Sequence, residues 1–298
     1  MAIFSAQPPY PFRLSSFGSA KIERMKTNIA PTSRSTRTLA ATVLSLILTA
    51  GSGYAAAEQV PTSLEVDYKI ALGGFDFGSA DIKAVIGGAD YELDALIKTE
   101  GVAEQFFETT FALASQGSFS GNRVKPSRFV STYADADSSR RVELTYPSSG
   151  APIMAAEPAY EDGFGPHVQL NDILMTQDPI SALLLPVRNT TASPCDRSLP
   201  LFDGRRRYDL QLREDGMMEM NDAEGGYNGP AMRCTVGMLP VAGYERKTLI
   251  KLLAREDSIR VWLAPLEGTD VWVPVRMTLR TPFGGAVMRA TRFEVAAN

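Results

Sequence analysis

Alternation of apolar and polar residues with a period of two is the feature that most limits what this chain can fold into. Across residues 64–72 the even positions are mostly apolar, while Glu65, Asp67 and Lys69 occupy odd positions. Successive side chains of a strand point to opposite faces, so the pattern predicts a strand with one buried face. The same period returns over residues 80–97, with a glycine pair in its middle. We therefore expect an antiparallel meander with tight glycine turns.

Alternating segments continue through the rest of the chain. They cover residues 109–119, 129–133, 142–146, 206–213, 232–239, 259–263, 273–279 and 287–295. Roughly ten or eleven strands predict a mainly β fold, built as a single strongly curved antiparallel sheet or a partly open β-barrel. Residues 151–171 are rich in proline and glycine and are expected to form a long surface excursion.

One segment has the pattern of an amphipathic helix. Asp178 suits the N-cap and Pro179 suits the first helical position. Apolar residues then recur with helical spacing as far as Val187. Because such a helix buries its apolar face, we expect it to pack on the concave side of the sheet.

The N-terminal segment differs in character from the rest. A run of twelve mostly apolar residues, 39–50, follows a cationic stretch and precedes Ala55 and Ala57. This order is typical of a cleavable signal peptide over residues 1–57, with cleavage between Ala57 and Glu58. The run is shorter than the about 20 residues that span a bilayer, so a permanent membrane anchor is the weaker alternative.

Translation from Met25 would give a signal peptide of ordinary length. Residues 1–24 are therefore interpreted as a mis-assigned start. The processed chain is expected to reach the periplasm with no transmembrane span, and residues 58–298 are expected to form a single β-rich domain.

Charge limits the partners of the processed chain. The full sequence has 30 Lys and Arg against 34 Asp and Glu, and removal of the leader leaves 24 against 33, a net charge near −9. Such a surface repels nucleic acid and anionic headgroups unless a local basic patch overcomes the repulsion. Residues 205–207, three consecutive arginines, are the candidate patch. In a strand their side chains would alternate between the two faces, which favours a solvated strand edge over an anion site.

Cysteine usage agrees with an oxidising compartment. The chain has two cysteines, Cys195 and Cys234, both beyond the leader. An isolated pair in an exported protein predicts a structural disulfide, and the spacing is unlike that of a redox-active Cys-x-x-Cys motif. One histidine in the chain leaves too few ligands for a zinc site.

The sequence offers no recognisable catalytic constellation. His167 is the single histidine, and no Gly-x-Ser-x-Gly elbow accompanies it. The glycine pairs lack the lysine and helix of a phosphate-binding loop and are interpreted as hairpin turns, as is Asp203-Gly204. We predict no catalytic residue, metal or cofactor and no enzymatic activity, with an envelope hydrolase as a minor alternative.

The tryptophans leave two alternatives. Trp262 alternates out of phase with Val261 and Leu263, so one of the two sets must face away from the core. Core or rim packing is the favoured interpretation, and an apolar ligand groove is the other. The candidate groove residues are Phe106, Phe107, Leu184, Trp262 and Trp272.

Three motifs in a fixed order carry a resemblance to a known family. They are residues 202–209 (Phe-Asp-Gly-Arg-Arg-Arg-Tyr-Asp), residues 178–184 (Asp-Pro-Ile-Ser-Ala-Leu-Leu), and residues 271–276 (Val-Trp-Val-Pro-Val-Arg) with the following Thr-Pro-Phe-Gly. On these motifs the chain resembles an exported proteobacterial family, domain of unknown function 3108, over about residues 64–295. More distantly, the expected curved sheet with an internal helix is similar to periplasmic lipoprotein carriers, whose concave face shelters acyl chains.

These observations predict a non-enzymatic periplasmic envelope protein. It is expected to bind an acyl chain or a hydrophobic segment in its curved sheet, with a lipid, a lipoprotein or another envelope protein as partner. The alternative is an envelope scaffold that interacts with proteins and has no small-molecule ligand.

Overall fold

The computed structural model describes residues 60–101, 103–105, 108–161, 163, 167–188, 192–222, 225–244, 258–281 and 284–297. The expected signal peptide, its cleavage residues Ala57 and Glu58, and the groove candidates Phe106 and Phe107 lie outside these residues.

The described chain is built almost entirely of strands. These are β1 (Thr62–Leu72), β2 (Phe75–Gly87), β3 (Asp90–Thr99), β4 (Thr109–Ser120), β5 (Arg123–Asp135), β6 (Ser139–Thr145), β7 (Ile153–Glu157), β8 (Leu185–Pro186), β9 (Arg197–Phe202), β10 (Arg207–Met220), β11 (Gly229–Ala242), β12 (Ile259–Pro265), β13 (Val271–Thr281) and β14 (Gly284–Ala297). Two short 3₁₀ turns, η1 (Leu170–Ile173) and η2 (Ser181–Leu183), lie between β7 and β8.

All strands belong to one antiparallel sheet. Its order is β7-β6-β5-β4-β3-β2-β1-β14-β13-β12-β11-β10-β9, with β8 paired to β13. Strands β1 to β3 form the predicted meander, which continues through β4 to β7, and pairing of β1 with β14 joins the two halves of the chain. Within the described residues no strand pairing joins β7 to β9, so the sheet is not closed.

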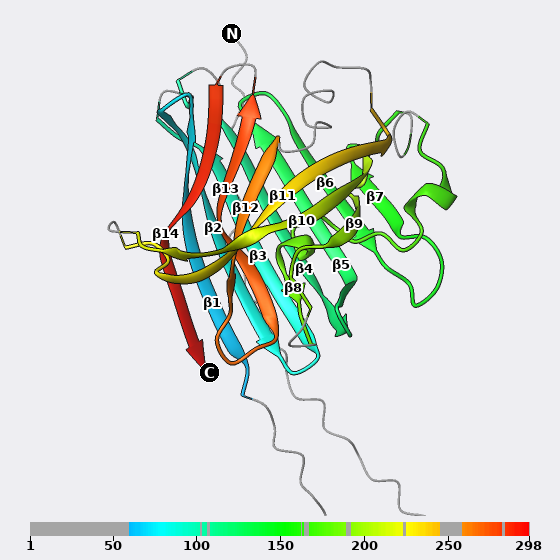
Figure 1. The fold of residues 1–298 in the computed structure, drawn as a ribbon. Coiled ribbons are helices and arrows are strands. Elements are labelled where there is room, and N and C mark those ends of the chain that lie inside the picture. The colour runs from blue at the N-terminus through cyan, green and yellow to red at the C-terminus, as the bar shows by residue number, and fades with distance from the viewer. Residues whose placement is uncertain are drawn as a thin grey trace, which may run out of the picture. The chain divides into compact units, whose positions relative to one another are not determined.

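The sheet curls so that its second half covers its first. Figure 1 shows the yellow strands β10 and β11 crossing in front of the blue-to-green strands β1 to β5. Side chains from both halves meet in one core, in which Leu93 of β3 and Leu144 of β6 pack with Phe202 of β9. Burial of these apolar faces against one another is what stabilises the curled arrangement. The fold is therefore mainly β, as predicted.

A second hydrophobic cluster lies on the other side of β12. It contains Leu263 together with both cysteines, and the disulfide links Cys195, just before β9, to Cys234 on β11. The structure thus confirms the predicted disulfide.

The amphipathic helix predicted over residues 178–187 is not formed. Asp178 does cap the segment, because its Oδ1 accepts the backbone N–H of Ile180 and of Ser181. Helical geometry then ends after the single turn η2. The residue before a proline avoids the helical region, and Leu185 and Pro186 instead pair with β13 as β8. No described segment is an α-helix, and this turn occupies the concave side where the helix was expected.

Residues 151–171 also differ from the expected irregular excursion. Ile153–Glu157 extends the sheet as β7, whose five residues pair with β6. Its exposure pattern alternates between exposed and half-buried positions without a fully buried face. Because the period-two signal needs a buried face, a short edge strand of this kind is hard to recognise from sequence.

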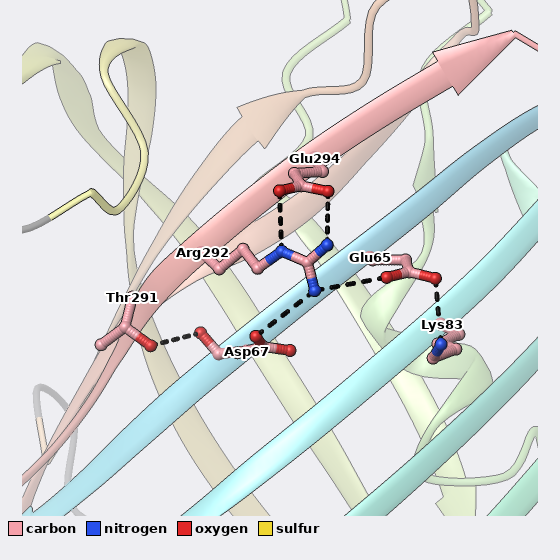
Figure 2. Close-up of polar contacts among 6 residues, drawn as sticks. All are labelled: Glu65, Asp67, Lys83, Thr291, Arg292 and Glu294. Atoms are coloured by element: carbon pink, nitrogen blue, oxygen red, sulfur yellow. Dashed lines mark hydrogen bonds and ion pairs between the residues drawn. The ribbon is translucent and has the colours of Figure 1, made fainter.

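Where β2, β1 and β14 lie side by side, the outer face of the sheet carries a cluster of charged side chains, which Figure 2 shows. Arg292 lies at the centre of the cluster and donates to both carboxylate oxygens of Glu294, at 2.7 and 2.5 Å. Its remaining terminal nitrogen lies 3.4 Å from Glu65 and 3.7 Å from Asp67. Glu65 also pairs with Lys83 at 2.9 Å. Exposed pairs of this kind contribute little to stability, and they mark the face of the sheet that is turned to water.

Candidate functional site

A cavity of about 420 Å³ lies at one end of the concave face, and we name it the arginine–tyrosine pocket. Its volume falls within the roughly 300–1,000 Å³ of typical small-molecule sites. Its walls come from β4, β5, β6, the segment after β7, the start of the capped turn and the β9–β10 connection. The lining residues are Phe111, Leu113, Phe129, Ser131, Tyr133, Arg140, Val142, Tyr160, Pro179, Asp203, Arg205 and Arg206.

The floor of the pocket continues the hydrophobic core. Phe129 is buried in the core, and Leu113 packs against it from the neighbouring strand β4. Val142 on β6 lies on the same face as the fully buried Leu144, because residues two apart on a strand share a face. At the rim the rings of Phe111 and Tyr133 pack with their centroids 5.0 Å apart. An apolar and aromatic surface therefore runs from the core to the mouth of the pocket.

Two arginines meet at one aromatic ring in this pocket. The guanidinium carbon of Arg140, on β6, lies 4.3 Å from the ring centroid of Tyr160. That of Arg205, in the β9–β10 connection, lies 4.6 Å from the same centroid. Both distances are typical of cation–π contacts. The ring therefore brings together two cations from opposite ends of the hydrogen-bonded sheet.

A tight turn positions Arg205. The Asp203 Oδ1 accepts the backbone N–H of Arg205 at 2.8 Å and that of Arg206 at 2.6 Å. Gly204, between Asp203 and Arg205, has a φ of +94°, and a Cβ there would lie 2.5 Å from Cγ1 of Val142. Glycine thus allows both the left-handed backbone and the close approach of this turn to β6.

A buried carboxyl group supports the pocket wall beside Pro179. Asp178 is fully buried, and its Oδ2 accepts the hydroxyl of Ser115 on β4 at 2.9 Å. Burial raises the pKa of the Asp178 carboxyl to about 6, although the hydrogen bonds from Ser181 and Ser115 oppose the shift. Burial also raises the pKa of Tyr146, and the nearby Asp178 charge adds to that shift. The capped turn is therefore held to the sheet by a buried polar group.

The three arginines are arranged differently from the sequence expectation. Strand β10 begins at Arg207, so Arg205 and Arg206 lie in the turn and line the same pocket. Arg207 alone points elsewhere, to the Asp172 carbonyl and the Asp209 carboxylate. The prediction that all three arginines lie in a strand, with side chains alternating between its two faces, was therefore wrong for Arg205 and Arg206. The Asp203-Gly204 turn signal was the clue, since residues after a turn need not alternate.

Neither Arg140 nor Tyr160 was predicted from the sequence to be a site residue. Arg140 is one of two adjacent arginines on β6, and alternation alone does not say which of them faces inward. Tyr160 lies after β7 in a segment without periodicity. Their meeting depends on contacts between segments that are distant in sequence.

The structure distributes the remaining groove candidates between the two hydrophobic clusters. Leu184 and Trp262 belong to the core on the concave face and are 3% and 9% exposed. The Trp262 indole N–H points to the sulfur of Met218. Trp272 packs against the disulfide cluster and pairs with Leu185. Of these three, Leu184 alone contributes to a described cavity.

That larger cavity, of about 960 Å³, lies beside the disulfide. Its apolar wall includes Leu184 and Leu199, but three arginines and several other polar groups also line it. Arg197 crosses this region and donates to the carbonyls of Pro186 and Ser193, each at 3.1 Å. The cavity is thus spanned by polar contacts within the protein, whereas the arginine–tyrosine pocket has a continuous apolar floor.

No cluster of three or more histidine, cysteine, aspartate or glutamate side chains among the described residues has metal-binding geometry. In the same part of the chain, every helical segment is too short or too polar to cross a bilayer.

Comparison with known proteins gives three results. No curated protein matches the sequence. The crystal structure of a β-barrel-like protein of domain of unknown function DUF1849 from Brucella abortus is similar over 80% of this chain and 99% of its own, with 11% identity and a TM-score of 0.47. A family model described as "Protein of unknown function (DUF3108)" matches residues 66–291, which confirms the resemblance seen in the three motifs: the chain belongs to this family.

Proposed function

We propose that this protein is a non-enzymatic envelope protein of the periplasm that binds an acyl chain or a hydrophobic segment in the arginine–tyrosine pocket. The observation that carries the proposal is the uninterrupted apolar surface from Phe129 in the core to Phe111 at the rim. Phe111 is 37% exposed, so part of this surface is in contact with water. Covering it with an acyl chain would gain about 0.8 kcal/mol for each buried methylene group.

The location of the pocket also supports the proposal. Two of the three family motifs contribute to it, through Pro179 and through the turn from Asp203 to Arg206. The Cys195–Cys234 disulfide supports folding in an oxidising compartment such as the periplasm.

Lipid content and lipid binding test the proposal directly. The purified protein is extracted and its lipids are identified by mass spectrometry, and the protein is then titrated with the fluorescent fatty acid cis-parinaric acid. We expect a saturable signal. Absence both of extracted lipid and of any fluorescence change would refute the proposal.

A pair of variants locates the binding. Ser131→Trp places a large ring in the pocket from β5, whereas Thr132→Trp places the same ring on the opposite face of that strand. Exclusion of two methylene groups costs roughly 1.6 kcal/mol, which corresponds to more than tenfold weaker binding. We expect this loss for Ser131→Trp alone. Equal binding by both variants would place the ligand elsewhere.

An envelope scaffold without a ligand is the second candidate function. Its support is the edge strand β7, on which Ile153 is 64% exposed. An edge strand with an exposed apolar side chain can accept a strand from a partner. A reproducible partner crosslinked through position 153, together with failure of every lipid test above, would favour this function.

A further inference from the structure

Another cavity, of about 440 Å³, lies where the β10–β11 hairpin meets β14 and the end of β12, and we name it the tyrosine–phenylalanine pocket. Figure 1 shows this hairpin crossing β14. The pocket shares no lining residue with the arginine–tyrosine pocket. Its walls include two aromatic rings, three apolar side chains and one carboxylate, which belong to Tyr227, Phe293, Pro230, Pro265, Val295 and Glu267.

The two aromatic rings form a corner of this pocket. The ring centroids of Tyr227 and Phe293 are 5.1 Å apart, and the ring planes meet at 71°. The Tyr227 hydroxyl donates to the carbonyl of Pro230 at 2.9 Å, which fixes this ring against the start of β11. Both rings are half-buried and pack against the core. The face of an aromatic ring carries partial negative charge, so two rings at this angle can contact one cation together.

The carboxylate of the pocket is carried by the turn between β12 and β13. Leu266 anchors this turn, because its side chain is buried and its carbonyl accepts the backbone N–H of Thr269 at 3.1 Å. Glu267 is exposed, and the described part of the chain provides no lysine or arginine within ion-pair distance of it. Its charge is therefore not neutralised by these residues.

The electrostatic surroundings of the pocket are negative. Arg289, on β14, does not compensate Glu267, because its guanidinium lies 3.7 Å from the Asp222 carboxylate and is paired there. Burial raises the pKa of Tyr227, and the charges of Glu219 and Glu267 raise it further. Two carboxylates from different hairpins thus act on one ring, in agreement with the negative net charge expected for the processed chain.

We propose that the tyrosine–phenylalanine pocket binds an alkylated ammonium group, such as that of choline. The cation contacts the rings of Tyr227 and Phe293, and Glu267 balances its charge. Its methyl groups match the apolar walls formed by Pro230 and Pro265. A lysine ammonium is more strongly hydrated, and a metal ion needs several oxygen ligands where this pocket offers one carboxylate. The site is separate from the function proposed above and does not depend on it.

Paired probes test the requirement for charge. The purified protein is titrated with choline and with dimethylbutanol, in which a carbon atom replaces the charged nitrogen. Binding is followed by NMR chemical shifts at constant low ionic strength, because salt screens an exposed charge. We expect choline to bind about fivefold more tightly or better, and the backbone amide signals of Gly226 and Asn228 to shift with it.

Three variants identify the groups responsible. Glu267→Gln and Phe293→Leu should each weaken choline binding about three- to fivefold and leave dimethylbutanol binding unchanged. The double variant should bind choline no better than dimethylbutanol. Glu104→Gln, in another exposed turn, is the matched control and should bind choline as the wild type does. Urea unfolding curves establish that each variant is folded.

The alkylated ammonium group can come from a free molecule or from a lipid headgroup. Flotation with phosphatidylcholine vesicles, compared with phosphatidylglycerol vesicles, tests the headgroup, and the choline titration tests the free molecule. Binding in either experiment that the double variant loses supports the inference. No binding in both experiments overturns it, as does equal affinity for choline and dimethylbutanol or an equal loss of choline binding in Glu104→Gln and Glu267→Gln. Lipid tests of the arginine–tyrosine pocket bear on none of these outcomes.

Discussion

Replacement of Asp178 by asparagine should change how the stability of the protein depends on pH. The carboxyl is fully buried and its pKa is about 6, against an ordinary value of 3.8. The folded state therefore holds this proton more tightly than the unfolded state does. Its contribution to stability is full below about pH 4 and is lost as the pH rises through about 6. A shift of roughly two units corresponds to about 3 kcal/mol.

Asparagine keeps most of the local contacts. Its side-chain oxygen can still accept the backbone N–H groups of Ile180 and Ser181, which Asp178 now binds at 3.2 and 2.8 Å. The Ser115 hydroxyl can donate to the Tyr91 hydroxyl, 3.3 Å away, while it accepts from the new amide. Alanine, in contrast, leaves the two backbone donors without their acceptor, so Asp178→Ala should be less stable than Asp178→Asn by about 1–3 kcal/mol at every pH.

Urea unfolding at several pH values measures the effect, with the fluorescence of Trp262 and Trp272 as the signal. Subtraction of the wild-type free energies of unfolding from those of Asp178→Asn removes the contribution of the other titrating groups. We expect the difference to move by about 3 kcal/mol in favour of Asn between about pH 4 and pH 7. A difference that is flat, or that moves in favour of Asp as the pH rises, would refute the reasoning.

Two further stability predictions concern the disulfide and the β9–β10 turn. Replacement of Cys195 and Cys234 by serine should lower the free energy of unfolding by about 4 kcal/mol, because the bond closes a loop of 39 residues in the unfolded chain. Reduction of the wild type should lower its free energy of unfolding by a similar amount, and an unchanged value would contradict this. Gly204→Ala should destabilise the protein by about 1–3 kcal/mol more than Gly216→Ala, measured by urea unfolding. The two glycines have φ angles of +94° and +93°, but a Cβ at 204 meets Val142 whereas a Cβ at 216 meets no atom within 4 Å; equal losses would mean that backbone strain alone matters.

The strands and the disulfide were predictable because their signals are local or simple to count. Alternation in residues 64–72 reflects one buried and one solvated face, and β1 occupies this range. Two cysteines allow a single intramolecular pairing, and the structure forms it. The signal peptide stays a prediction, since its residues are outside the described chain.

Whether residues 178–187 form a helix, and where the pocket lies, depended on information that local patterns lack. The apolar spacing after Asp178 fits a helix, yet pairing of Leu185 with Trp272 across the sheet draws the chain into a strand. Periodicity cannot represent this competition, because the partner strand is distant in sequence.

Local patterns and motifs were enough to predict that the chain forms antiparallel strands, that its two cysteines are bonded, and which family it belongs to. Tertiary structure alone decided that the sheet curls until its β9–β10 turn touches β6, which places Arg140 and Arg205 on the ring of Tyr160. The physical reason is that side-chain alternation specifies which face of each strand is buried, whereas the site depends on how far the whole sheet curls, and that is set by packing throughout the shared core.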